Sequence, residues 1–61
     1  MANYTLTNGY TVTTSDAPGG GTEFVTKCPA GDVISSVTFH GMDAAELERD
    51  LIVANRLAAM A

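Results

Sequence analysis

Apolar and polar side chains alternate through the first fourteen residues, a pattern typical of β-strands. The Asn-Gly pair at positions 8 and 9 lies in the middle of this pattern and is a strong turn signal. A three-residue loop over residues 7–9 pairs Leu6 with Tyr10 and places Gly9 in the left-handed position of a turn with a bulge. We therefore predict a β-hairpin over residues 3–14. Its apolar face consists of Tyr4, Leu6, Tyr10 and Val12, and its polar face of Thr5, Thr11 and Thr13.

A single long strand that runs straight through Gly9 is the alternative interpretation. All four apolar residues lie at even positions, so the alternation would continue unbroken across Gly9. The Asn-Gly turn signal favours the hairpin over this strand.

Proline and glycine divide the middle of the chain into further strands and turns. Pro18 and the three glycines that follow it stop any regular element, and a Pro-Ala-Gly sequence that begins at Pro29 marks a turn. In the strand after this turn, alternation puts Val33, Val37 and Phe39 on the buried face. The predicted segments are a loop over 15–22, a strand over 23–28, a turn over 29–32 and a strand over 33–40.

The spacing of apolar residues changes to three and four after residue 43, which predicts a helix over residues 44–60. Asp43 is a suitable N-cap, and Glu46 follows three residues later, as in a capping box. One stripe of this helix is predicted to face the sheet, and it consists of Leu47, Leu51, Ala54 and Ala58.

The second half of the predicted helix is apolar on most of its sides. A helix of this kind is buried on more than one side, and a 61-residue chain has little else with which to cover it. We therefore predict self-association, as a homodimer or a larger homo-oligomer, with a frayed, sticky C-terminal segment as the alternative. The predicted oligomer interface consists of Ile52, Val53, Leu57 and Met60.

The order of these elements predicts an α+β fold. We expect one domain over residues 1–61, with a small antiparallel sheet of three to four strands and one C-terminal helix packed on one face of the sheet. A chain of this length buries only about 60% of its extended surface, so a core of its own is marginal.

The content of cysteine and histidine limits the stabilising devices and cofactors. One cysteine, Cys28, excludes an internal disulfide and the zinc sites that are built on cysteine pairs. With His40 as the only histidine, we expect no metal and no other cofactor. The chain has no apolar run long enough for a membrane span and no signal-peptide pattern, and a free thiol suits a reducing compartment, so we expect a cytoplasmic protein without a membrane partner.

The charge balance indicates the kind of partner. Seven acidic and three basic residues give a net charge of −4. Direct binding to nucleic acid needs clustered lysine and arginine and is therefore disfavoured. An acidic surface favours a larger partner protein with a basic surface, such as the nucleic-acid site of another protein. The predicted partner-binding residues are Asp43, Glu46 and Asp50 on the helix and Thr5, Thr11 and Thr13 on the polar hairpin face.

Two further features are candidates for chemistry. The three glycines Gly19, Gly20 and Gly21 resemble a phosphate-binding loop, but that motif needs a following lysine and a serine or threonine that open a helix. Here a strand is predicted to follow the glycines, and Glu23 would repel phosphate. Cys28 and His40 are residue types that can form a nucleophile and its base. Nothing in the sequence brings them together, so we predict no catalytic residues and no enzyme activity.

These observations favour a small acidic, non-catalytic protein-binding module. The size, the acidity and the strands-then-helix order resemble those of many phage-encoded inhibitors, including anti-CRISPR proteins, which implies an inhibitor or adaptor that docks on a larger, nucleic-acid-handling protein. This resemblance lies in size and charge and not in a motif. Three alternatives remain: a homo-oligomeric small-ligand binding or sequestering protein with sites between subunits, an enzyme that uses Cys28 or His40, and a structural subunit of a larger assembly.

Overall fold

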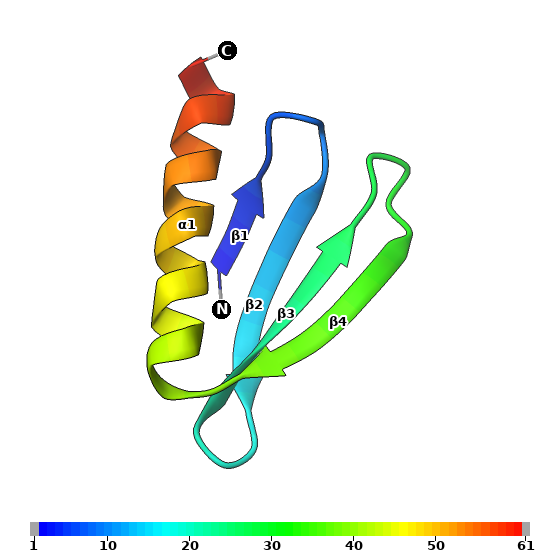
Figure 1. Ribbon diagram of the computed structural model, residues 1–61. Coiled ribbons are helices and arrows are strands. Elements are labelled where there is room, and N and C mark those ends of the chain that lie inside the picture. The colour runs from blue at the N-terminus through cyan, green and yellow to red at the C-terminus, as the bar shows by residue number, and fades with distance from the viewer. Residues whose placement is uncertain (1, 61) are drawn as a thin grey trace.

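The computed structural model describes residues 2–60 and shows four strands followed by one helix (Figure 1). The strands form one antiparallel sheet in the order β1-β2-β3-β4, and the helix packs on one face of it. The predicted α+β class is therefore confirmed. The elements are β1 (Ala2–Thr5), β2 (Thr11–Ala17), β3 (Gly21–Lys27), β4 (Val33–Phe39) and α1 (Gly41–Met60).

The first hairpin has the predicted three-residue loop. Tyr4 lies opposite Val12 in the β1–β2 register, and the Leu6 N–H donates to the Tyr10 carbonyl at 2.8 Å. Gly9 has a φ of 86°, the left-handed conformation that favours glycine. The long-strand alternative is therefore wrong.

The predicted loop over residues 15–22 is wrong at both ends. β2 continues to Ala17 and β3 begins at Gly21, so the loop is only Pro18–Gly20. The pairing of Ala17 with Gly21 extends the β2–β3 ladder up to this loop. Strand pairing needs only backbone groups, so the low strand propensity of the side chains at both ends does not prevent it.

The imidazole ring of His40 lies over Gly21, the first residue of β3. A Cβ atom at this position would lie 2.6 Å from Nε2 of His40, because the imidazole ring covers the glycine. Glycine is the residue that leaves room for such a close approach. The contact joins the start of β3 to the residue that follows β4.

The turn between β3 and β4 forms as predicted, but β4 is not buried. The Cys28 N–H donates to the Asp32 carbonyl at 2.9 Å and closes the turn. All seven residues of β4 are exposed, and Val33 is exposed to 58%. A register shift between Thr26 and Lys27 places Val33 opposite Lys27. The prediction that Val33, Val37 and Phe39 share a buried face is therefore wrong.

Helix α1 leaves the end of β4 and runs beside β1 (Figure 1). It begins at Gly41, so Asp43 lies in its first turn and is not the N-cap that the sequence predicts. A carboxylate in the first turn still interacts favourably with the helix dipole. The predicted sheet-facing stripe is confirmed at Leu51, which is buried, and at Leu47, which packs against the core. Ala44, which the prediction left out, is also buried, whereas Ala54 and Ala58 are only half-buried.

The core lies between α1 and the part of the sheet nearest to it. Phe24 of β3 is its most buried large side chain, with 2% of its surface exposed. The Phe39 ring lies against it, with centroids 5.9 Å apart in an edge-to-face arrangement. The core residues are Tyr4, Val12, Phe24, Ala44 and Leu51. Among residues 2–60, no helix is long and apolar enough to cross a membrane.

Candidate functional site: the outer stripe of the helix

Six exposed residues form one stripe along the side of α1 that does not pack on the sheet. Their positions are separated by three, four, three, four and three residues, which keeps them on one side of a helix. Leu51 and Ala44 lie outside this stripe and face the core. We call the six residues the outer stripe: Asp43, Glu46, Asp50, Val53, Leu57 and Met60.

The outer stripe has two chemically different halves. Its N-terminal half consists of three carboxylates, Asp43, Glu46 and Asp50. Its C-terminal half is apolar, with Val53 exposed to 49% and Leu57 to 54%. At 1.5 Å per residue the stripe is about 26 Å long. An acidic half next to an apolar half is a surface that can hold a partner by charge and by burial of apolar area.

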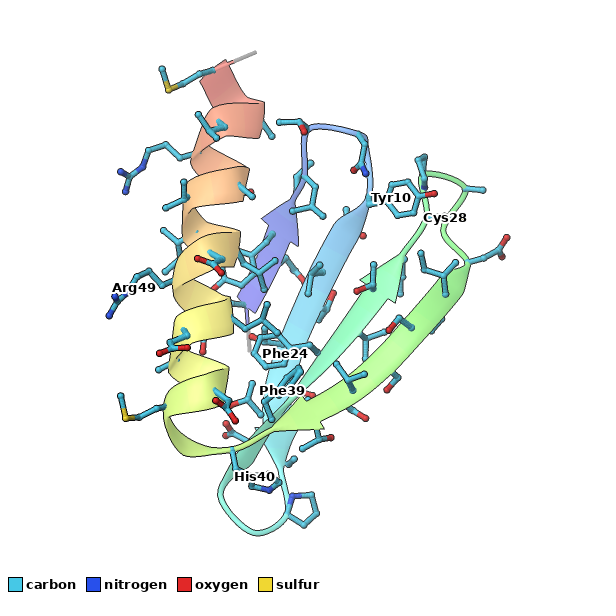
Figure 2. All side chains as sticks on the ribbon, in the orientation of Figure 1. Tyr10, Phe24, Cys28, Phe39, His40 and Arg49 are labelled. Atoms are coloured by element: carbon cyan, nitrogen blue, oxygen red, sulfur yellow. The ribbon has the colours of Figure 1, made fainter. Side chains whose placement is uncertain are left out.

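The other charged residues of α1 lie beside the outer stripe or on the side of the helix that faces the sheet. Glu48 points to the sheet, where its Oε2 accepts a hydrogen bond from the Tyr4 hydroxyl at 3.2 Å. Arg49 projects away from the sheet (Figure 2) and, like Arg56, directly precedes a stripe residue, so the two arginines border the stripe on one side.

The sequence prediction divides the outer stripe between two different partners. The sequence places the three carboxylates in a protein-binding surface and Val53, Leu57 and Met60 in an interface between copies of the chain. The structure brings them together on one side of α1 and leaves Ile52 on another side, exposed to 45%. The alternating three and four spacing from residue 43 to residue 60 was the signal that could have joined them.

The three threonines of the predicted polar face lie in the first hairpin. Thr5 lies opposite Thr11 in the register, and the Thr13 hydroxyl donates to Asn3 Oδ1 at 3.0 Å. Thr5 is exposed, whereas Thr11 and Thr13 are half-buried. Alternation along β2 places Thr11 and Thr13 on the face opposite the buried Val12, away from α1.

The hydrogen bond between Tyr4 and Glu48 ties β1 to α1. Burial raises the pKa of the Tyr4 phenol, and the hydrogen bond to the Glu48 carboxylate and the charge of that carboxylate raise it further. Deprotonation of the phenol would place a negative charge beside Glu48. The neutral phenol is therefore the form that the fold stabilises.

We expect Tyr4→Phe to lower the free energy of unfolding at pH 7 by about 0.5–1.5 kcal/mol, since a net hydrogen bond is lost. A raised pKa in the folded state stabilises the protein fully below the phenol's ordinary value of 10.0, and this contribution disappears as the pH rises through the folded-state pKa. The difference between wild type and Tyr4→Phe in urea unfolding should therefore shrink above pH 10. A difference that stays constant into that range would contradict the assignment.

The residues that the sequence offers as candidates for chemistry do not form one site in the structure. Cys28 lies at one end of the sheet and His40 at the other (Figure 2). Gly19 and Gly20 lie in the β2–β3 loop, whereas Gly21 belongs to β3 and is covered by His40, so the three glycines do not form one loop.

The Cys28 thiol lies at the β3–β4 turn. Hydrogen bonds from backbone amides, first that of Asp32 and then that of Ala30, lower its pKa. The structure describes no group of three or more potential metal ligands and no pocket among residues 2–60. Comparison of the chain with known protein families, with curated proteins and with solved structures gave no match.

Proposed function

We propose that this protein is a non-catalytic protein-binding module that docks on a larger partner through the outer stripe of α1. The observation that carries the proposal is the joining of three exposed carboxylates and three exposed apolar side chains in one stripe. Burial of the apolar half would supply affinity, and the acidic half would supply orientation and selectivity.

The complementary partner is a helix or groove with basic residues facing Asp43, Glu46 and Asp50 and apolar residues facing the other half. Basic surfaces are characteristic of proteins that handle nucleic acid, because they neutralise phosphates. This charge therefore favours an inhibitor or adaptor of a nucleic-acid-handling protein. The net charge of −4 would further favour the approach of a basic partner.

A second copy of the chain does not complement the outer stripe along its full length. Two parallel stripes would place carboxylates against carboxylates. Two antiparallel stripes would place Asp43 against Met60 and Asp50 against Val53, which buries charge without a partner. The antiparallel arrangement would also bring Arg49 close to Arg56 of the other copy. We therefore propose a different protein as the occupant of this surface.

A helical peptide with a complementary stripe tests the docking surface. The probe carries three lysines followed by three leucines at three and four spacing, and is made in both orders to allow parallel and antiparallel binding. We expect one order to bind, and Leu57→Asp to weaken that binding about tenfold or more, since a central apolar contact of an interface is lost. Fluorescence anisotropy of the labelled peptide measures the dissociation constant.

Thr13→Asp is the matched control, because it adds the same charge on the sheet face away from α1. We expect it to change the dissociation constant by less than about twofold. Equal weakening by Leu57→Asp and Thr13→Asp, or stronger weakening by Thr13→Asp, would move the docking surface away from the outer stripe. Failure of both peptide orders to bind would contradict the proposal.

A further inference from the structure

Strand β4 is the open edge of the sheet. The strand order places β1 and β4 at the two edges, and no strand among residues 2–60 pairs with the outer side of β4. All seven of its residues are exposed, with Ile34 at 56% and Val37 at 44%. An edge strand presents a row of unpaired backbone N–H and C=O groups, and the group that satisfies such a row is another strand.

The other edge strand of the sheet, β1, is protected against pairing with another strand, whereas β4 is not. β1 has only four residues, and the Asn55 side chain of α1 accepts a hydrogen bond from the Thr5 N–H at 2.8 Å. Short length and cover by a helix are two of the devices that prevent edge pairing. β4 has neither, and its sequence VISSVTF contains no proline and no charged residue. Its register shift leaves Ile34 without a partner on β3, and Ser35–Phe39 pairs regularly with β3.

We infer that the occupant of this edge is β4 of a second copy, paired antiparallel about a two-fold axis. The chain carries a net charge of −4, so two copies repel each other wherever their acidic surfaces meet. β4 is uncharged along its whole length, and two copies can pair there without placing acid against acid. Backbone pairing would also bring Val37 and Phe39 of the two copies together on one face.

The pairing does not rest on the proposed docking function, but it deepens that function. A two-fold axis perpendicular to the sheet joins the two sheets into one of eight strands and puts both helices on the same face. The two outer stripes would then belong to one bivalent module. Two linked sites can raise the overall affinity for a partner with paired sites by about 10²–10⁴ without any new contact.

Sedimentation equilibrium across a concentration series tests the pairing, with Val37→Lys and Val53→Lys as a matched pair. Both substitutions place a lysine at a valine that is about half exposed, 44% and 49%. We expect wild type and Val53→Lys to have twice the mass of one chain, and Val37→Lys to be a folded monomer by circular dichroism. A monomeric wild type at all concentrations, or a dimer that Val53→Lys dissociates and Val37→Lys does not, would overturn the inference.

Cysteine cross-linking tests the geometry independently of any loss of stability. Single cysteines are placed at Ser35, Ser36 and Val37 in a Cys28→Ser background, and Val53→Cys in the same background is the control. Residues next to the two-fold axis of an antiparallel pair lie about 4.5–5.5 Å apart at Cα, within reach of a disulfide. We expect rapid copper-phenanthroline cross-linking at one of the three β4 positions and none at Val53. Cross-linking that is absent from β4, or equally fast at Val53, would overturn β4 pairing and leave the outer stripe as a separate question.

Discussion

Replacement of Phe24 by alanine is expected to remove most of the stability of this protein. Phe24 is exposed to only 2% and lies against the Phe39 ring, with centroids 5.9 Å apart. Truncation of a buried phenylalanine costs about 3–5 kcal/mol. At about 0.05–0.15 kcal/mol per residue, a chain of 61 residues has about 3–9 kcal/mol in total. Urea unfolding followed by circular dichroism measures the loss.

Two further variants keep this prediction testable if Phe24→Ala fails to fold. Phe24→Leu keeps part of the buried volume, and we expect a loss of about 1–2 kcal/mol. Phe39→Ala removes the other ring of the pair, which is exposed to 36%, and should cost less than Phe24→Ala. A greater loss for Phe39→Ala would show that the core is centred on β4 and not on β3.

Leu51→Ala is expected to cost about 2–5 kcal/mol, because Leu51 is the large side chain that α1 buries in the core, with 8% exposed. Leu57→Ala is the matched control on the same helix, and 54% of Leu57 is exposed. The chemical change and the gain in helix propensity are the same for both variants, so the difference between them reports burial. We expect Leu57→Ala to stay within about 0.5 kcal/mol of wild type in urea unfolding.

The difference in stability between Leu51→Ala and Leu57→Ala also tests whether the outer stripe is exposed in solution. An outer stripe that is free to bind a partner must contribute little to the stability of the unbound chain. Equal losses for Leu51→Ala and Leu57→Ala would show that Leu57 is buried in solution, and the outer stripe would then be unavailable to a partner.

Local signals were enough to predict the first hairpin and the inner face of α1. The Asn-Gly pair and the even spacing of apolar residues predict both the loop over residues 7–9 and the pairing of Tyr4 with Val12, as the structure shows them. The three and four spacing around Leu51 fixed the face of α1 that packs on the sheet. In both cases the information lies within a few neighbouring residues.

The exposure of β4 could not be predicted from its own sequence, because it depends on the width of the helix. A helix is about 10–12 Å across, whereas the outer strands of a four-stranded sheet lie about 14 Å apart. One helix beside β1 therefore leaves the far edge uncovered. Alternation in β4 correctly predicts that Val37 and Phe39 lie on the same face of the sheet. It does not predict that both side chains are exposed on this face.

The outer stripe shows the opposite situation, in which the information was present but was divided. Asp50 and Val53 are three residues apart on one side of α1, so a carboxylate and an apolar side chain belong to the same surface. A surface that combines carboxylates and apolar groups becomes visible when position on the helix is considered before residue type.

A charge exchange between the outer stripe and a peptide tests the docking claim most directly. The protein variant carries both Glu46→Lys and Asp50→Lys and is compared with wild type. The two peptides have identical leucines, and one carries three lysines where the other carries three glutamates. We expect wild type to bind the lysine peptide and not the glutamate peptide, and the doubly substituted protein to reverse this preference. Both interactions should weaken as salt is added. Dissociation constants that depend neither on the charge of the peptide nor on the two substitutions would contradict the docking claim.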